Sequence, residues 1–187
     1  MKKRIPILAL ATLCTAGGSS AKDWDFTTDY LQISINDQGY ITSMKNRTAS
    51  PQREFAHPHR PSPVLSLYDE SSRKYLLPVK ASYRPVRRLL RLSYANGVQA
   101  DVRIDTHSKY IRLQLADLQP RDKVDAVQWG TLHTNISNLF GEIIGVARDT
   151  SEAVNYSIGL LALDDNTLGG TADLQGDAAP FQYVIHT

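Results

Sequence analysis

The sequence predicts an all-β protein, an antiparallel β-sandwich. From Tyr30 onward, apolar and polar residues alternate with a period of two, and turn residues separate the alternating runs. No stretch repeats its apolar residues at the spacing of a helix. The composition, 42% hydrophobic and 21% charged, is typical of a globular domain. We therefore expect one sandwich domain over residues 22–187.

Residues 1–21 predict an export signal. Residues 2–4 are basic, residues 5–16 are apolar, and the small residues 19–21 resemble a cleavage site. The apolar stretch is too short for a membrane span, which needs about 20 residues. We expect an exported chain that begins near Lys22, is periplasmic or extracellular, and has no membrane contact after signal removal.

The only cysteine, Cys14, lies inside this leader, so the exported part would contain no thiol and no disulfide. Attachment as a lipoprotein through Cys14 is the alternative localisation. Leu13 disfavours it, because lipoprotein signals carry a small residue before the cysteine.

The charge balance excludes a basic field for nucleic acid. The chain has 21 basic and 19 acidic residues. Removal of the leader takes away three of the basic residues, which leaves a net charge of about −1. Arg87, Arg88 and Arg91 do cluster. Because Arg88 and Arg91 alternate with leucines, they indicate a solvated sheet face rather than a phosphate site.

The first element is a hairpin: residues 31–35 (LQISI) and 40–44 (YITSM) are joined by a turn at 36–39 (NDQG). Residues 46–63 contain four prolines and predict a long irregular connection. The His57-Pro58-His59 motif within it has no third ligand nearby, so we expect no metal site.

The remaining strands are predicted from similar alternating runs. Asn96-Gly97 joins two of these runs and is a strong hairpin signal. Residues 135–140 are the only place where the pattern leaves room for a helix, and an isolated apolar run at 181–185 favours a chain truncated at its C-terminus. The predicted strands are 64–69, 74–83, 86–94, 98–105, 110–118, 124–129, 142–149 and 156–163.

Three later blocks resemble a known family. WGTLHTNIS (129–137), FGEIIGVARD (140–149) and IGLLALDDNTLGG (158–170) look like consecutive segments of the galactose-mutarotase-like β-supersandwich that forms the N-terminal domain of large, secreted, glycoside hydrolase-like bacterial enzymes. The hairpin at 36–44 also resembles the first hairpin of such domains. The similarity covers about residues 30–175. It implies a non-catalytic module whose catalytic region would follow beyond Thr187.

Trp129 is the candidate carbohydrate-binding residue, because its flat ring could stack on the face of a sugar. The alternative is a core role, since Val124 and Val127 lead into it as a buried strand would. Tyr68 and Tyr94 are further candidates for stacking.

His133 and Glu142 are the weak catalytic candidates, since mutarotase-like enzymes transfer protons between a histidine and a carboxylate. A structural polar network at this corner is the alternative. The acidic turn at 164–166 does not have the spacing of a calcium loop, and no nucleotide, zinc or serine-nucleophile motif occurs. We therefore expect no cofactor and no metal.

The sequence thus favours an exported, non-catalytic sandwich module of glycan processing, with a structural role or weak contact to a glycan partner. A free-standing carbohydrate-binding protein is the first alternative, and a small sugar mutarotase or lyase is the second. The residues set no oligomeric state.

Overall fold

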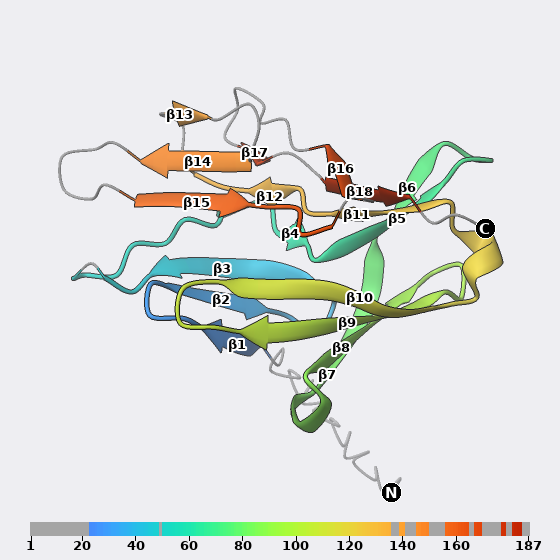
Figure 1. Cartoon of the computed structure of the whole chain (residues 1–187), viewed down its shortest axis with the longest axis horizontal. Helices are drawn as coiled ribbons and strands as arrows, with labels where there is room; N and C mark the ends of the chain where they lie inside the picture. Colours follow the sequence, from blue (N-terminus) through green and yellow to red (C-terminus); the bar gives the residue numbers. More distant parts are fainter. Residues whose placement is uncertain are drawn as a thin grey trace, which may run out of the picture.

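Among the residues that the structure describes, the regular elements are antiparallel β-strands and two short 3-10 turns (Figure 1). A computed structural model describes residues 23–48, 50–135, 139–140, 145–149, 156–164, 167–169, 177–178 and 181–184. Within these ranges there is no α-helix, and no helix long and apolar enough to cross a membrane. The predicted all-β antiparallel sandwich is confirmed. The predicted leader (1–21), with Cys14, lies outside the described residues.

The elements follow the chain in this order. The first ten strands are β1 (Trp24–Thr27), β2 (Leu31–Ile35), β3 (Tyr40–Asn46), β4 (Ser62–Pro63), β5 (Leu65–Asp69), β6 (Lys74–Leu76), β7 (Pro78–Arg84), β8 (Leu89–Tyr94), β9 (Gln99–Thr106) and β10 (Ile111–Gln119). The turns η1 (Pro85–Arg87) and η2 (Arg121–Lys123) precede β8 and β11. The later strands are β11 (Ala126–Trp129), β12 (Leu132–His133), β13 (Leu139–Phe140), β14 (Gly145–Asp149), β15 (Tyr156–Leu160), β16 (Thr167–Gly169), β17 (Asp177–Ala178) and β18 (Phe181–Val184).

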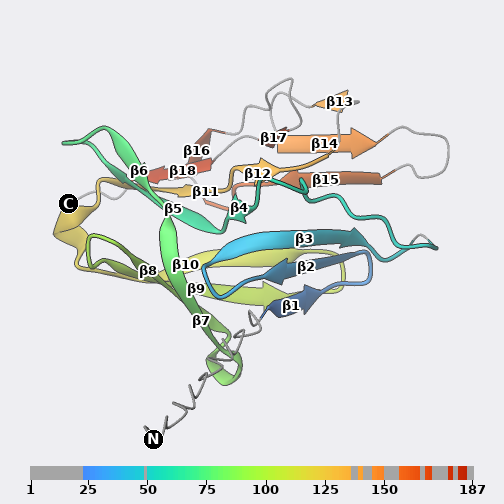
Figure 2. The same cartoon turned by 180° about the vertical axis from the view of Figure 1, so that it is seen from behind.

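Two four-stranded sheets, β1-β2-β3-β4 and β10-β9-β8-β7, face each other. β10 passes in front of β3 in Figure 1 and behind it in Figure 2. The ring of Phe26 on β1 meets the ring of Tyr83 on β7 edge-on, with 5.0 Å between centroids. A third sheet, β16-β18-β11-β5-β6, and the smaller groups β12-β17 and β13-β14-β15 lie along one side of this pair.

One hydrophobic core joins the three larger sheets. Its completely buried side chains include Ile35 of β2, Leu90 of β8, Val102 of β9 and Val127 of β11, each 0% exposed. Because successive side chains of a strand point to opposite faces, the neighbours of Leu90 and Val102 point outward. This alternation places the polar side chains of β9 and β10 on the outer face of their sheet.

The first predicted hairpin is confirmed, and its turn is part of the packing between sheets. Gly39 has φ +91° and donates its N–H to the Asn36 carbonyl over 3.0 Å. The turn is fixed from outside as well: Ala81 donates its N–H to the Asp37 carbonyl (2.6 Å), and Val64 donates to the Gly39 carbonyl (3.0 Å). The hairpin predicted at Asn96-Gly97 is also confirmed, joining β8 to β9.

Two predicted strands have different bounds in the structure. The run 74–83 divides into β6 and β7, which belong to different sheets, because Pro78 has no N–H to donate to a continuous ladder. The run 86–94 starts as a strand only at Leu89. Before it, η1 ends at Arg87, and the left-handed backbone of the next residue, Arg88 (φ 53°), interrupts the extended conformation.

Other differences concern short elements. β1 was not predicted, since WDFT is too short to establish an alternation. Residues 139–140 form the strand β13 instead of part of a helix. The apolar run near the end of the chain forms β18, which lies between β16 and β11 inside its sheet and not at an edge.

Tyr94, a predicted stacking residue, is instead buried: 4% of its surface is exposed, and its hydroxyl donates to the Leu65 carbonyl over 2.9 Å. Burial also raises the pKa of Tyr94. Tyr94→Phe should lower the free energy of unfolding by about 1 kcal/mol, because a buried carbonyl loses its donor. Urea unfolding measures this loss, and Tyr110→Phe, at a 53% exposed residue, is the matched control without effect. Equal stabilities of wild type and Tyr94→Phe would contradict this role.

Candidate functional site

Trp129 ends β11 on the side of the sheet that faces the core. In the register with β5, Val127 pairs with Leu67 and Trp129 with Leu65, so Trp129 shares the face of Val127. Val127, Leu65 and Leu67 are at most 1% exposed, and the half-buried Trp129 packs against the same cluster. Its ring therefore contributes to the sandwich, and stacking of a sugar on Trp129 stays a prediction.

His133, on β12, connects the predicted corner to the irregular connection through its backbone. Its N–H donates to the Ser62 hydroxyl (2.7 Å), and its carbonyl accepts the His57 N–H (3.0 Å). Asn135 continues the contact, since its side-chain amide donates to the Glu54 carbonyl over 2.9 Å. These bonds give the segment a structural function. Glu142 lies outside the described residues, so its pairing with His133 stays a prediction.

The other polar motifs form local turns. The His59 N–H donates to Nδ1 of His57 over 3.2 Å, and Thr167 donates its hydroxyl to the Asp164 carboxylate over 2.9 Å. In the part of the chain that the structure describes, no three His, Cys, Asp or Glu side chains gather as metal ligands. Tyr68 is half-buried on β5 and lies beside Tyr75, with 5.0 Å between ring centroids.

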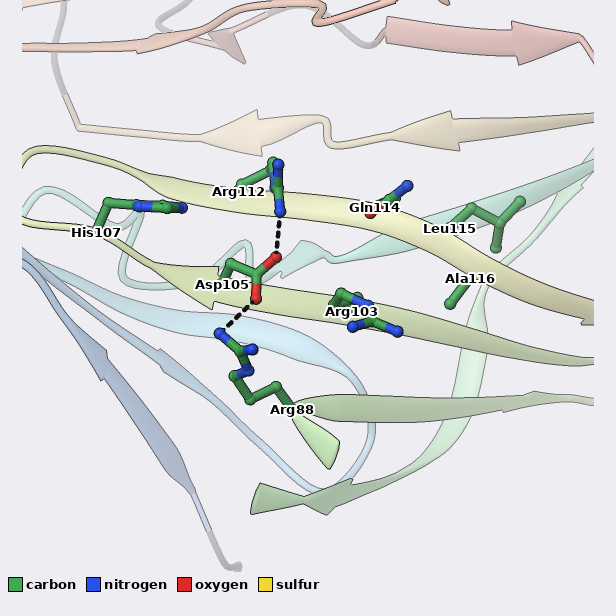
Figure 3. Close-up of a pocket in the computed structure, with 8 residues that line it drawn as sticks. All are labelled: Arg88, Arg103, Asp105, His107, Arg112, Gln114, Leu115 and Ala116. Atoms are coloured by element: carbon green, nitrogen blue, oxygen red, sulfur yellow. Dashed lines mark hydrogen bonds and ion pairs between the residues drawn. The ribbon is translucent and has the colours of Figure 1, made fainter. Parts of the chain in front are cut away.

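A different feature, on the outer face of the β10-β9-β8-β7 sheet, has the form of a binding site (Figure 3). It is an open hollow of about 430 Å³, which we call the arginine depression. Its lining residues come from β9, the residue after β9, β10 and the residue before β8, and they are Arg88, Arg103, Asp105, His107, Arg112, Gln114, Leu115 and Ala116.

Asp105 holds two of the three guanidinium groups in place. It accepts a hydrogen bond from Nη2 of Arg112 (2.6 Å) and pairs with Nη1 of Arg88 (2.9 Å), as the dashed lines of Figure 3 show. Only 4% of Asp105 is exposed, whereas the side chains of Arg88 and Arg112 are 60% and 43% exposed. The hydrogen bond from Arg112 keeps the pKa of Asp105 below its usual value, and the charge of Arg88 adds to this effect.

Arg88 reaches Asp105 because of its unusual backbone. At the end of η1 it adopts the left-handed conformation that glycine most often takes, and its N–H donates to the Pro85 carbonyl (3.1 Å). Ile104 on β9 donates its N–H to the Arg88 carbonyl over 2.9 Å. This second bond continues the register in which Leu89 pairs with Arg103, and it holds Arg88 opposite Ile104, next to Asp105.

Arg103 is the guanidinium without a fixed partner. It is exposed, and it forms no hydrogen bond or ion pair with the described residues. Gln114 lies directly opposite it on β10. By contrast Arg91, on the same outer face, is paired with Asp101 through two 2.7 Å bonds. The depression therefore contains three guanidinium groups, one carboxylate, and donors that are free to meet a ligand.

An aromatic pair borders the depression where β9 turns into β10. The rings of His107 and Tyr110 stack with centroids 4.4 Å apart and planes at 23°. Tyr110 is 53% exposed, so part of the pair faces solvent. A flat ring beside fixed donors is a combination that binds the apolar and polar parts of one small molecule.

Short sequence patterns do not predict this site, because its residues are brought together by strand pairing. Of the clustered Arg87, Arg88 and Arg91, only Arg88 lines the depression. The available signal was the two-residue spacing of Arg103, Asp105 and His107, combined with the hairpin that brings 112–114 opposite 103–105.

Comparisons of the chain with protein-family models, with curated proteins and with solved structures returned no match. The fold and the depression define the class of the protein as an all-β antiparallel sandwich with a cationic hollow on one sheet face.

Proposed function

We propose that this protein is a non-catalytic β-sandwich module of an exported glycan-processing system, and that it binds saccharide on the outer face of the β10-β9-β8-β7 sheet. The sandwich fold is compatible with the galactose-mutarotase-like module that residues 129–137 and 140–149 resemble. The arginine depression is the observation that carries the proposal. It combines hydrogen-bond donors on two strands with a partly exposed aromatic pair.

The groups in the depression favour binding over proton transfer. General acid–base catalysis on a sugar needs two titratable groups, one to donate a proton and one to accept it. Asp105 is the only carboxylate among the described residues that line the depression, and its lowered pKa keeps it ionised at neutral pH. His107 also lines the depression, but proton transfer with it would need a carboxylate that is not already engaged. Because both neighbouring guanidinium groups occupy Asp105, it orients Arg88 and Arg112 and does not serve as an acid.

The shape of the site indicates a modest affinity. The depression is open and lies on a sheet face, so it covers one side of a ligand and leaves the other side in water. Sites that bind tightly bury most of their ligand, about 70–90% of its surface. A module of this kind would hold a polymer near an enzyme through repeated weak contacts.

A glycan microarray tests this function. We expect the protein to be retained on a subset of saccharides, with dissociation constants in the micromolar to millimolar range typical of shallow sites. Chromatography of the same saccharides after incubation should show no new products. If the protein is retained on no saccharide, the proposed binding function is wrong. If new products are released, the proposal that the module is non-catalytic is wrong.

A further inference from the structure

We infer that the arginine depression recognises an acidic sugar, and that Arg103 contacts the carboxylate of a uronic acid residue. This inference rests on the proposed saccharide-binding function and specifies its ligand class.

The charges of the depression carry the first step. Arg88, Arg103 and Arg112 line it, whereas Asp105 is the only acidic residue among its described lining residues. Asp105 is already engaged by Arg88 and Arg112. The positive charge that remains is balanced by no other lining residue, and an anionic group of the ligand would balance it.

Arg103 offers its guanidinium donors to a ligand. A guanidinium has five N–H donors in a planar fork that matches a carboxylate. None of the donors of Arg103 is used within the described residues, and its side chain lies on the outer face opposite Gln114. Gln114 adds an amide that can donate to a sugar hydroxyl or accept from one.

The third step is that the other donors are held in fixed positions. Arg112 and Arg88 each form a contact of 2.6–2.9 Å to Asp105. Their rotamers are therefore restricted before a ligand arrives, which reduces the entropy that binding must offset. Each still has further N–H donors that Asp105 does not use.

The fourth step distinguishes a sugar acid from a simple anion. The stacked His107 and Tyr110 rings lie beside the cations, and the exposed part of Tyr110 offers an apolar surface. A uronic acid has an apolar C–H face for such a ring and a carboxylate for a guanidinium. Acetate or inorganic phosphate would satisfy only the second requirement.

Isothermal titration calorimetry of the whole chain tests the inference. The ligands are short oligomers of galacturonic, glucuronic and mannuronic acid, the carboxyl-reduced form of each, sulfated oligosaccharides, acetate and inorganic phosphate. We expect at least one oligouronate to bind, and its carboxyl-reduced form to bind at least about tenfold more weakly. The affinity for the oligouronate should fall as salt is added.

The variant series identifies Arg103. Arg103→Gln should weaken oligouronate binding about tenfold or more, since one charge-assisted contact is lost. Arg103→Lys should have an intermediate effect, because an ammonium keeps the charge and loses the fork. Lys80→Gln removes one charge from the same sheet outside the depression, and is expected to change little. Thermal unfolding should change little in all three, because neither Arg103 nor Lys80 forms a hydrogen bond or ion pair with the described residues.

The outcomes separate the inference from the function on which it rests. Equal binding of oligouronates and their carboxyl-reduced forms, unaffected by Arg103→Gln, would overturn acidic-sugar recognition and leave saccharide binding intact. Acetate, phosphate or any sulfated oligosaccharide binding as tightly as the best oligouronate would overturn the uronate assignment. If no saccharide binds, whether charged or carboxyl-reduced, both the acidic-sugar inference and the proposed saccharide-binding function would be overturned.

Discussion

Gly39→Ala should lower the free energy of unfolding by roughly 2–4 kcal/mol, measured by urea denaturation. The backbone of Gly39 has φ +91°, a conformation that costs an L-residue about 1–2 kcal/mol. An added Cβ would also lie 2.6 Å from Cδ2 of Leu92 and 3.2 Å from Cβ of Pro78. Leu92 is 0% exposed, so its side chain cannot move aside into solvent.

Gly97→Ala separates these two contributions. Gly97 has a similar φ of +85°, yet nothing lies within 4 Å of an added Cβ. This variant should therefore lose only the conformational part, about 1–2 kcal/mol. Equal losses for the two variants would contradict the conclusion that the turn of the first hairpin is packed between the sheets.

Glu54→Ala should destabilise the protein by roughly 2–3 kcal/mol at neutral pH. The Glu54 carboxylate accepts hydrogen bonds from the Met44 N–H (2.6 Å), the Ala56 N–H (2.9 Å) and the Ser43 hydroxyl (2.5 Å). Met44 and Ala56 are buried, so removal of the carboxylate leaves two backbone donors without an acceptor. Asp69→Ala is the control, because the Asp69 carboxylate accepts its bonds from Ser71 and Ser72 in an exposed turn and should contribute clearly less.

The stabilisation by Glu54 should depend on pH. Burial acts to raise the pKa of Glu54, but the bonds from Ser43, Met44 and Ala56 and the charge of Lys45 outweigh it, and the pKa is lowered in the folded state. A lowered pKa stabilises the fold above the unfolded value of about 4.3 and ceases to do so as the pH falls through the folded value. The difference between wild type and Glu54→Ala should be full at pH 7 and shrink below about pH 4. A difference that stays constant down to pH 2–3 would contradict this assignment.

Much of the fold could be predicted from the sequence because it depends on local patterns. Alternation over 31–35 and 98–105, and the turns at Gly39 and Gly97, specify hairpins through neighbouring residues alone. The division of 74–83 between two sheets is different, since it depends on contacts with β5 and β8, which lie elsewhere in the chain. An alternating pattern does not contain that information.

The site could not be predicted in the same way. Arg88, Asp105 and Arg112 are separated in the sequence. They meet because β9 pairs with β10 and because the Ile104 N–H donates a hydrogen bond to the Arg88 carbonyl. The predicted candidates Trp129 and His133 lie instead where the sandwich packs and where the irregular connection is held. The tryptophan and histidine of residues 129–137 thus mark a structural corner. The cationic surface arises instead from arginines that strand pairing brings together.

Chemical-shift mapping by NMR tests the central claim, that saccharide binds to the arginine depression, most directly. In a titration with the oligouronate that binds best, the amides of residues 103–107 and 110–116 should shift together, with one dissociation constant. The amides around Trp129 and His133 should remain in place. Shifts centred on Trp129 and His133, with residues 103–116 unchanged, would contradict the claim and return the binding site to the corner that the sequence singled out.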